Sequence, residues 1–406
     1  MTLQELTANN EHFTIHNLPY GIFSTPTKSA RAGIAIGNYI LDLAKLAELN
    51  FFNNPSLNEI FNQATLNDFI ALGKAIHQEV RQEILQLLSN DSAFFKEQHP
   101  AFVYKQCEAK MHVPIHIGAY TDFYSSEEHA SNVGKMFRPN AEPLLPNWKH
   151  MPIAYHGRSS SIITTNTNIK RPNGQVLNGN NVEFSPSKTV DIEIELGFII
   201  GKENELGAPI NIDKANEYIF GAVLLNDFSA RDIQRWEYQP LGPFLGKNFA
   251  TAISPWIVPF DALNEFIADA PIQLPTVLPY LQEQNRKNFD IKITFEIETS
   301  TKQKTTVAST NAKYIYWTVA QQIAHHTING CNLRVGDLLG TGTISGKEKS
   351  SFGSLLELTW NGTEPINIGT EQRTFLQDGD TTILSAICKN EHNQIGFGDV
   401  RNRIIS

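Results

Sequence analysis

Four acidic residues in three separate segments of the chain could together bind a metal ion: Asp122, Glu193, Glu195 and Asp227. Glu193 and Glu195 alternate with apolar residues, so an extended strand would place both carboxylates on one face and Ile192, Ile194 and Leu196 on the other. Like charges crowded into a buried place raise each other's pKa and cost stability, and a divalent cation relieves that cost.

An all-oxygen set of this kind favours Ca²⁺, Mg²⁺ or Mn²⁺ over zinc, which prefers cysteine or histidine. The alternative is that Asp191, Glu193 and Glu195 form a solvated strand face, as is common in antiparallel sheets. Asp191 could belong to such a face even if the other two bind metal.

His129 is a candidate general base. Ser125 and Glu128 have the spacing of a capping box, which places His129 in the first turns of a helix. A lone histidine is more often structural, but Asp122 and Tyr124 lie within the same nine residues and favour a chemical role.

Residues 227–238 form a dense polar and aromatic run directly after an apolar strand. As a helix, this run would place Asp227, Arg231, Gln234 and Tyr238 on one face, or it could be a surface helix with internal ion pairs. Lys247 follows in an apolar loop between glycines, a suitable place for a desolvated cation.

Residues 340–347 superficially suggest a nucleotide-binding loop. Five residues separate Gly340 from Gly346, and Ser345 takes the third glycine position of a dinucleotide fingerprint, so both motifs fail. We interpret the segment as a tight loop with exposed amides and a useful Thr343 hydroxyl, and we interpret His325 and His326 as structural.

Composition excludes several classes of protein. The chain has 406 residues and a formal net charge of −9, without a basic block, which argues against general nucleic-acid binding. No apolar run is long enough for a membrane span, and the polar N-terminus is unlike a signal peptide. The three cysteines are far apart and in no metal spacing, as expected of free thiols in a cytoplasmic protein.

The elements that must position these residues divide the chain near residue 115. Residues 1–115 are expected to form a small β-rich unit with two strands in 31–43, which turn at Gly37-Asn38, and an amphipathic helix over 66–88. From residue 116, strands are predicted at 191–200, 219–225, 290–298, 333–339, 354–359 and 381–388. A helix is predicted at 318–329, with Thr318 and Gln321 as a capping box and Gly330 as its stop. The expected architecture is mainly β, with an antiparallel or mixed sheet.

Five runs in residues 116–406 resemble, in order, the fumarylacetoacetate hydrolase family: TDFYSSEEHASNVGKMFR, DIEIELGF, NDFSARDIQRWEYQPLGPFLGKNFATAISPW, GTGTISG and FGSLLELTW. The resemblance implies an SH3-like β-barrel domain over residues 1–115, a mixed β-roll catalytic domain over 116–406, and a homodimer. It also implies hydrolysis of 4-fumarylacetoacetate to fumarate and acetoacetate, the last step of tyrosine and phenylalanine breakdown. Smaller hydratases and decarboxylases of the superfamily lack the N-terminal domain.

The resemblance also assigns roles to residues. It implies that Asp122, Glu193, Glu195 and Asp227 are Ca²⁺ ligands, and that Lys247 and Thr251 lie near a second, Mg²⁺-type ion. It implies that His129 is the base, that Glu357, expected in an apolar strand, orients it, and that Arg231, Gln234 and Lys247 surround the reacting carbons. The implied substrate-binding residues are Tyr124, Arg138, Gln234, Tyr238 and Thr343.

These roles fit the chemistry of cleaving a carbon–carbon bond in a β-diketone. A base must activate water, and positive charge must stabilise the enolate that leaves. Two alternatives remain: a related hydrolase acting on another acylpyruvate or diketone, and a non-catalytic metal-binding scaffold. A purely structural Ca²⁺ site would need neither His129, Glu357 nor Lys247, which disfavours the scaffold.

Overall fold

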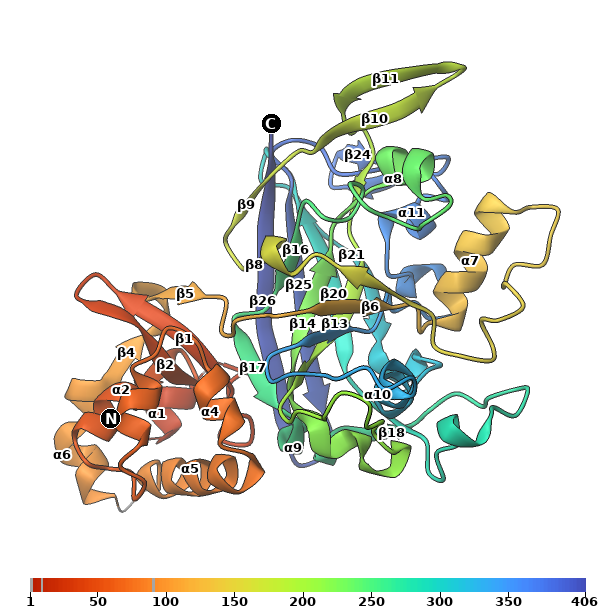
Figure 1. Ribbon diagram of the computed structural model, residues 1–406. Coiled ribbons are helices and arrows are strands. Elements are labelled where there is room, and N and C mark those ends of the chain that lie inside the picture. Colours follow the sequence, from red (N-terminus) through yellow and green to blue (C-terminus); the bar gives the residue numbers. More distant parts are fainter. Residues whose placement is uncertain (1–2, 9, 90–91) are drawn as a thin grey trace.

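The computed structural model describes residues 3–8, 10–89 and 92–406 (Figure 1). An N-terminal unit, red and orange in Figure 1, lies beside a larger part built around long strands. Strand β1 (Tyr20–Thr25) of this unit pairs with β17 (Trp256–Pro259) of the larger part, so one sheet runs through both.

The largest sheet among the described residues has 13 strands. Its main path runs β4 (Val103–Lys105), β3 (Tyr39–Asp42), β2 (Lys28–Ile36), β1, β17, β14 (Ile219–Asp227), β13 (Ile194–Ile200), β22 (Leu338–Gly340), β6 (Tyr120–Phe123) and β7 (Ala154–Gly157). Off this path, β5 (Lys110–His112) pairs with β1, β16 (Thr251–Ile253) with β14, and β8 (Ile162–Thr164) with β16. Most pairs are antiparallel, but β22 with β6 and β16 with β8 are parallel, which confirms the predicted mainly β, mixed architecture.

A second sheet and several strand pairs complete the β structure. The second sheet has the order β21 (Lys304–Asn311), β20 (Lys292–Glu298), β25 (Thr381–Lys389), β26 (Gln394–Ile405) and β9 (Asn168–Lys170). The pairs are β10 (Asn173–Asn178) with β11 (Asn181–Pro186), β12 (Val190–Asp191) with β15 (Ser229–Ala230), β18 (Ile267–Asp269) with β19 (Lys287–Phe289), and β23 (Ile366–Ile368) with β24 (Glu371–Arg373). The β10–β11 hairpin projects from one end of the molecule (Figure 1).

The helices lie around these sheets and are mostly short. They are α1 (Leu3–Thr7), α2 (Leu43–Glu48), α3 (Leu57–Phe61), α4 (Asn67–Ala71), α5 (Lys74–Leu87), α6 (Ala93–Phe102), α7 (Glu127–Phe137), α8 (Arg231–Glu237), α9 (Phe260–Leu263), α10 (Val319–Thr327) and α11 (Leu355–Leu358). The described helices are too short or too polar to traverse a lipid bilayer.

Both faces of the central strands are covered by apolar side chains. Leu196, Phe198 and Leu224 pack into the main core of the larger part, while Ile199 and Val223 pack into the core of the N-terminal unit. The alternation of side chains along each strand produces this division. A rigid, doubly covered sheet therefore holds the ends of β13, β14 and β6, where the acidic residues lie.

Several sequence predictions hold and others need correction. The strands around Gly37-Asn38 are confirmed, as is the capping box of Thr318 and Gln321 on α10. The helix expected over 66–88 is two helices, because Gly73 adopts a φ of 84° between them. The strand expected over 333–339 is reduced to β22, because Asp337 accepts a hydrogen bond from the amide of Arg334 and closes a turn.

Two further corrections concern the site. The strand expected over 191–200 is interrupted between β12 and β13, and Glu193 makes only an isolated bridge with Ser354. The strand expected over 354–359 is instead the short helix α11, because the Ser354 side chain caps the amide of Glu357.

The three cysteines are free thiols, as predicted. The SH3-like barrel and the boundary at residue 115 stay predictions.

Candidate functional site

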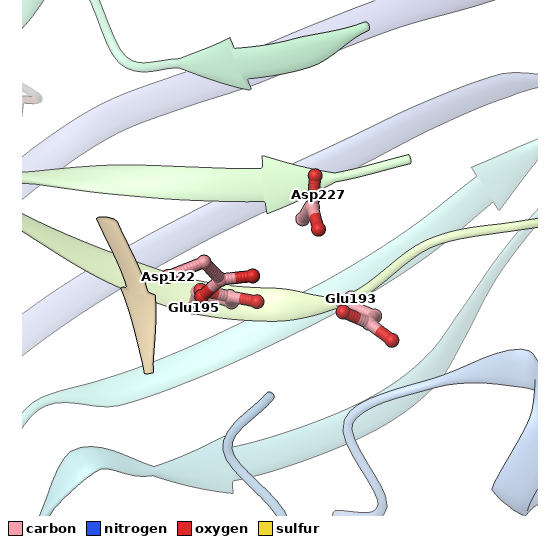
Figure 2. A group of neighbouring side chains, drawn as sticks. All are labelled: Asp122, Glu193, Glu195 and Asp227. Atoms are coloured by element: carbon pink, nitrogen blue, oxygen red, sulfur yellow. The ribbon is translucent and has the colours of Figure 1, made fainter. Parts of the chain in front are cut away.

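The four acids predicted as metal ligands lie together at the end of the central strands. Asp122 is on β6, Glu195 on β13, Asp227 at the end of β14, and Glu193 just before β13 (Figure 2). One carboxylate oxygen of each residue lies within 4.8 Å of the others, and all four residues are buried. The antiparallel register of β13 and β14, which pairs Glu195 with Leu225, brings the start of one strand to the end of the other.

Neighbouring protein groups leave part of this cluster unsatisfied. Oδ1 of Asp122 and Oε1 of Glu195 are buried and find no hydrogen-bond partner in the described part of the chain. Burial, with added repulsion from Asp227, raises the pKa of Asp122 to about 8. Burial and the charges of Asp122 and Asp227 also raise the pKa of Glu195. Buried, mutually repelling oxygens with free lone pairs are the donor set that a divalent cation such as Ca²⁺ or Mg²⁺ takes, so the residues fit the predicted metal.

Gly340, which has no side chain, leaves room for the carboxylates of Asp122 and Glu195. It lies on β22, between β6 and β13, and faces Asp122 across the parallel pair. A Cβ atom at this position would lie 3.0 Å from Oδ1 of Asp122 and 3.0 Å from Oε2 of Glu195. A larger residue would therefore require both carboxylates to shift by a few tenths of an ångström.

Lys247 is in direct contact with the cluster, as expected of a desolvated cation. Its Nζ donates to Oε2 of Glu193 at 2.5 Å and to Oδ2 of Asp227 at 2.6 Å. Burial alone would lower the pKa of Lys247, but the carboxylates of Asp227 and Glu193 outweigh burial and raise it. Thr251 donates to Oδ1 of Asp227 at 2.8 Å, so it too lies at the cluster.

Arg231 approaches the same acids from α8. Its Nη2 lies 2.7 Å from Oε1 of Glu193, and its Nη1 donates to Oε1 of Gln234 at 3.1 Å. Burial would raise the pKa of Glu193, but the charges of Lys247 and Arg231 prevail and hold it well below its usual range. Two buried cations thus border the four acids on one side.

A histidine–carboxylate pair lies near the same acids, since the charge of His129 is among those that lower the pKa of Glu193. Nδ1 of His129, in the first turn of α7, lies 2.7 Å from Oε2 of Glu357 on α11, and both side chains are buried. With Nδ1–H donated to the carboxylate, Nε2 is left as the basic nitrogen of the ring. The helix is capped by Ser126, one residue later than predicted, through the amide of His129.

Glu357 is held in its ionised form by donors around it. Asn132 donates to Oε1 at 3.0 Å, Ser345 to both oxygens at 2.9 and 3.0 Å, and Ser354 to Oε2 at 2.8 Å. Burial would raise the pKa of Glu357, but His129 and these hydrogen bonds lower it overall. The ionised carboxylate therefore accepts a hydrogen bond from the imidazole and fixes the orientation of the ring.

The remaining predicted residues differ in how closely they approach this centre. The ring of Tyr124 lies edge-on to that of His129, with centroids 5.4 Å apart, and Arg138 is close enough to oppose the rise that burial causes in the pKa of Tyr124. Thr343 is buried, and its Oγ1 has no hydrogen-bond partner among the described residues. Tyr238 is 45% exposed at the end of α8, where its hydroxyl accepts a hydrogen bond from Gln239.

One expectation about the acids, and the alternative to a metal site, are wrong. Asp227 does not share a helix face with Arg231, because it ends strand β14 and α8 begins only at Arg231. Asp191, Glu193 and Glu195 are not a solvated face, because all three are buried. Asp191 instead accepts hydrogen bonds from protein groups, including Nε of Arg231 at 2.8 Å.

Several residues of the site were not found by sequence reasoning. Asn132 stands one helical turn after His129, so its spacing could have revealed it. Tyr155 on β7 donates to Oδ2 of Asp227 at 3.0 Å, but its position follows from strand pairing and has no local signal. Ser345 and Ser354 reach Glu357 from a loop and from a helix cap that had been expected to be a strand.

Comparison with known proteins agrees with this arrangement. The family model described as Fumarylacetoacetate (FAA) hydrolase C-terminal matches residues 118–405, and the model described as Fumarylacetoacetase N-terminal matches residues 16–114. The fumarylacetoacetase of Homo sapiens is 48% identical over 410 residues, which cover 98% of this chain and 97% of that protein. Those of Dictyostelium discoideum and Arabidopsis thaliana are 47% and 46% identical, and each comparison covers 98% of this chain and 96% of the relative.

Two solved structures share the fold at low sequence identity. A fumarylacetoacetate hydrolase from Exiguobacterium antarcticum has a TM-score of 0.55 at 15% identity, covering 96% of this chain and 99% of that one. A maleylpyruvate hydrolase from Sphingobium has a TM-score of 0.53 at 14% identity, with the same coverage. Because close to half of its residues are identical to those of fumarylacetoacetases over almost their whole length, the chain belongs to the fumarylacetoacetase family.

Proposed function

We propose that the chain hydrolyses 4-fumarylacetoacetate to fumarate and acetoacetate, the last step of tyrosine and phenylalanine breakdown. The observation that carries this proposal is the buried His129–Glu357 pair beside four acids and two buried cations, in a chain 48% identical to a fumarylacetoacetase. The pair supplies a base for water, and the cations supply charge for the leaving enolate.

His129 is the proposed general base. Nε2 takes a proton from water while Glu357 stabilises the imidazolium through Nδ1. The water oxygen then forms a bond to the carbonyl carbon on the fumaroyl side, and the carbon–carbon bond to the acetoacetate fragment breaks. The electron pair of that bond passes to the acetoacetate carbon, which takes up a proton to complete the second product.

Arg231, Gln234 and Lys247 are proposed to stabilise the carbanion or enolate that develops. Arg231 and Lys247 keep their charge because the acids around them compensate for burial. Tyr124, Arg138, Gln234, Tyr238 and Thr343 are the proposed substrate-binding residues. Arg138 suits a substrate carboxylate, and the unpaired Oγ1 of Thr343 offers a hydrogen bond.

Asp122, Glu193, Glu195 and Asp227 are proposed to hold Ca²⁺, which would bind the diketone oxygens and stabilise negative charge there. Thr251, which shares Asp227, would stand at a second, Mg²⁺-type ion. Lys247 would stand beside that ion without ligating it, because an ammonium group has no lone pair to give.

A homodimer and a cytoplasmic location are also proposed for this chain. A homodimer would cover exposed apolar side chains on the β10–β11 hairpin and on the loop after α8: Leu177, Val182, Phe184, Leu241 and Phe244. Three free thiols fit a cytoplasmic location, and the 1–115 and 116–406 domains would meet near residue 115. Light scattering coupled to size-exclusion chromatography tests the dimer.

A substrate assay tests the function. Purified protein should remove the ultraviolet absorbance of the diketone in 4-fumarylacetoacetate, and chromatography should recover fumarate and acetoacetate in equal amounts. Chelator should suppress turnover and added divalent cation should restore it. Faster turnover of simple acylpyruvates than of 4-fumarylacetoacetate would favour a related hydrolase instead, and no turnover of any diketone would favour a non-catalytic scaffold.

A further inference from the structure

Asp191 forms hydrogen bonds both to Arg231 and to helix α11, and it has no role in the proposed chemistry. Its side chain is fully buried. Oδ2 accepts from Nε of Arg231 at 2.8 Å and from the amide of Leu356 at 3.0 Å, while Oδ1 accepts from the amides of Leu355 and Ile192, each at 2.7 Å. One carboxylate therefore accepts hydrogen bonds from one guanidinium group and from three backbone amides.

Those partners belong to the two elements that carry the proposed chemistry. Leu355 and Leu356 begin α11, whose next residue is Glu357, the partner of His129. Arg231 begins α8 and reaches Glu193 and Gln234 with its other nitrogens. The carboxylate of Asp191 is the direct link between α11 and the guanidinium of Arg231.

We propose that Asp191 is a positioning residue. It fixes the proposed general base His129, together with its partner Glu357, relative to Arg231. This inference rests on the proposed function. Its physical basis is the strictness of catalytic geometry: a displacement of about 1 Å by a remote change costs about 10²-fold in rate. A carboxylate that accepts from both elements holds their separation, whereas a neutral amide, with one acceptor oxygen, cannot keep all of these hydrogen bonds.

Asp380 offers a matched control elsewhere in the chain. It is equally buried and pairs with Arg373 through Nε–Oδ2 at 2.8 Å and Nη2–Oδ1 at 2.9 Å. Its Oδ2 also accepts from the amide of Gln377 at 2.9 Å. Both aspartates are thus buried, and both accept hydrogen bonds from an arginine and from the backbone. Arg373 and Gln377, the partners of Asp380, lie outside the site.

The experiment compares Asp191→Asn with Asp380→Asn in the full-length, metal-loaded enzyme, well below the melting temperature of each. We expect Asp191→Asn to lower kcat about 10²-fold with KM changed by less than about threefold, because binding contacts remain while transition-state geometry is lost. Asp380→Asn should lower the melting temperature and leave kcat unchanged. Asp191→Asn combined with Arg231→Gln should be no slower than Arg231→Gln alone, because residues that act through one another are not additive.

Three results would overturn the proposal. The first is a folded Asp191→Asn enzyme with wild-type kcat, and the second is an equal loss of kcat in Asp380→Asn. If Asp191→Asn does not fold, Asp191→Ser takes its place, and failure of both while Asp380→Asn folds would assign Asp191 to stability alone. Each variant is compared with the wild type on whichever diketone the wild type turns over, so a wild type inactive on 4-fumarylacetoacetate refutes the proposed function separately.

Discussion

Nδ1 of His129 lies 2.7 Å from Oε2 of Glu357, although 228 positions separate the two residues in the chain. Helix α7 carries the histidine and helix α11 carries the carboxylate. The fold brings them together in a buried place where the charge of Glu357 is satisfied by Asn132, Ser345 and Ser354. A base oriented in this way leads to the first two predictions.

His129→Gln should lower kcat by about 10²–10⁴-fold, the usual contribution of a positioned general base. Glutamine keeps a polar side chain of similar length, so folding and metal binding should be retained. Steady-state kinetics measures this loss, and His77→Gln, in the N-terminal unit, is the control. Near-wild-type kcat in His129→Gln would place the base elsewhere.

Glu357→Gln should lower kcat in the same direction, because the amide removes the negative charge that favours the imidazolium. Adding this change to His129→Gln should cost little more than His129→Gln alone, since the two residues act as a unit. The measurement is kcat at one pH for four proteins: the wild type, the two single variants and the double variant. Additive losses would mean that Glu357 acts independently of His129.

Asp227→Ala should abolish the effect of Ca²⁺ on stability. A ligand present at 100 times its Kd stabilises the folded state by about 2.7 kcal/mol, so Ca²⁺ should raise the melting temperature of the wild type. The variant lacks a ligand that also holds Lys247 and Thr251, so its melting temperature should not respond. Scanning calorimetry and isothermal titration with Ca²⁺ and Mg²⁺ measure this, with Asp380→Asn as the control. A response equal to that of the wild type would contradict the four-acid assignment.

Asp42 should make the wild type lose stability as the pH rises from about 4 to about 6. Burial raises the pKa of this carboxyl from 3.8 to about 6, against an opposing hydrogen bond from the amide of Lys45 and the charge of Arg31. The folded state therefore holds its proton to higher pH than the unfolded state, and stability falls where only the folded state is protonated.

Asp42→Asn removes this titration while an oxygen remains to cap α2. Between pH 4 and pH 7, the unfolding free energy of Asp42→Asn relative to the wild type should rise by at most about 3 kcal/mol, at about 1.4 kcal/mol per pKa unit. Urea denaturation at the two pH values gives the difference. If the difference between Asp42→Asn and the wild type is the same at the two pH values, the prediction is refuted.

The sequence predicts well those features of the site that depend on a local pattern of residues. The alternation of Glu193 and Glu195 with isoleucines places Ile192, Ile194 and Leu196 in the core, as expected. The capping spacing around residues 125–129 places His129 in the first turn of a helix. Both inferences need only neighbouring residues.

The elements that the sequence misses depend on distant partners. Residues 355–358 form an apolar run too short to separate helix from strand by periodicity. The Ser354 cap is a local signal for the helix. Asp191 adds to it by accepting the amides of Leu355 and Leu356 from 164 and 165 positions away. Nothing within residues 354–359 encodes that contact, and the same is true of the bond from Tyr155 to Asp227.

Gly340 makes metal affinity adjustable without changing any ligand. Its backbone angles suit any residue, so the obstacle to alanine is the pair of carboxylate oxygens 3.0 Å from the added methyl group. Gly340→Ala would shift the carboxylates of Asp122 and Glu195 by a few tenths of an ångström while keeping every charge, proton acceptor and cation of the site. One methyl group on the middle strand would thus weaken metal binding without removing a ligand, and would separate what the metal contributes to catalysis from what the acids contribute.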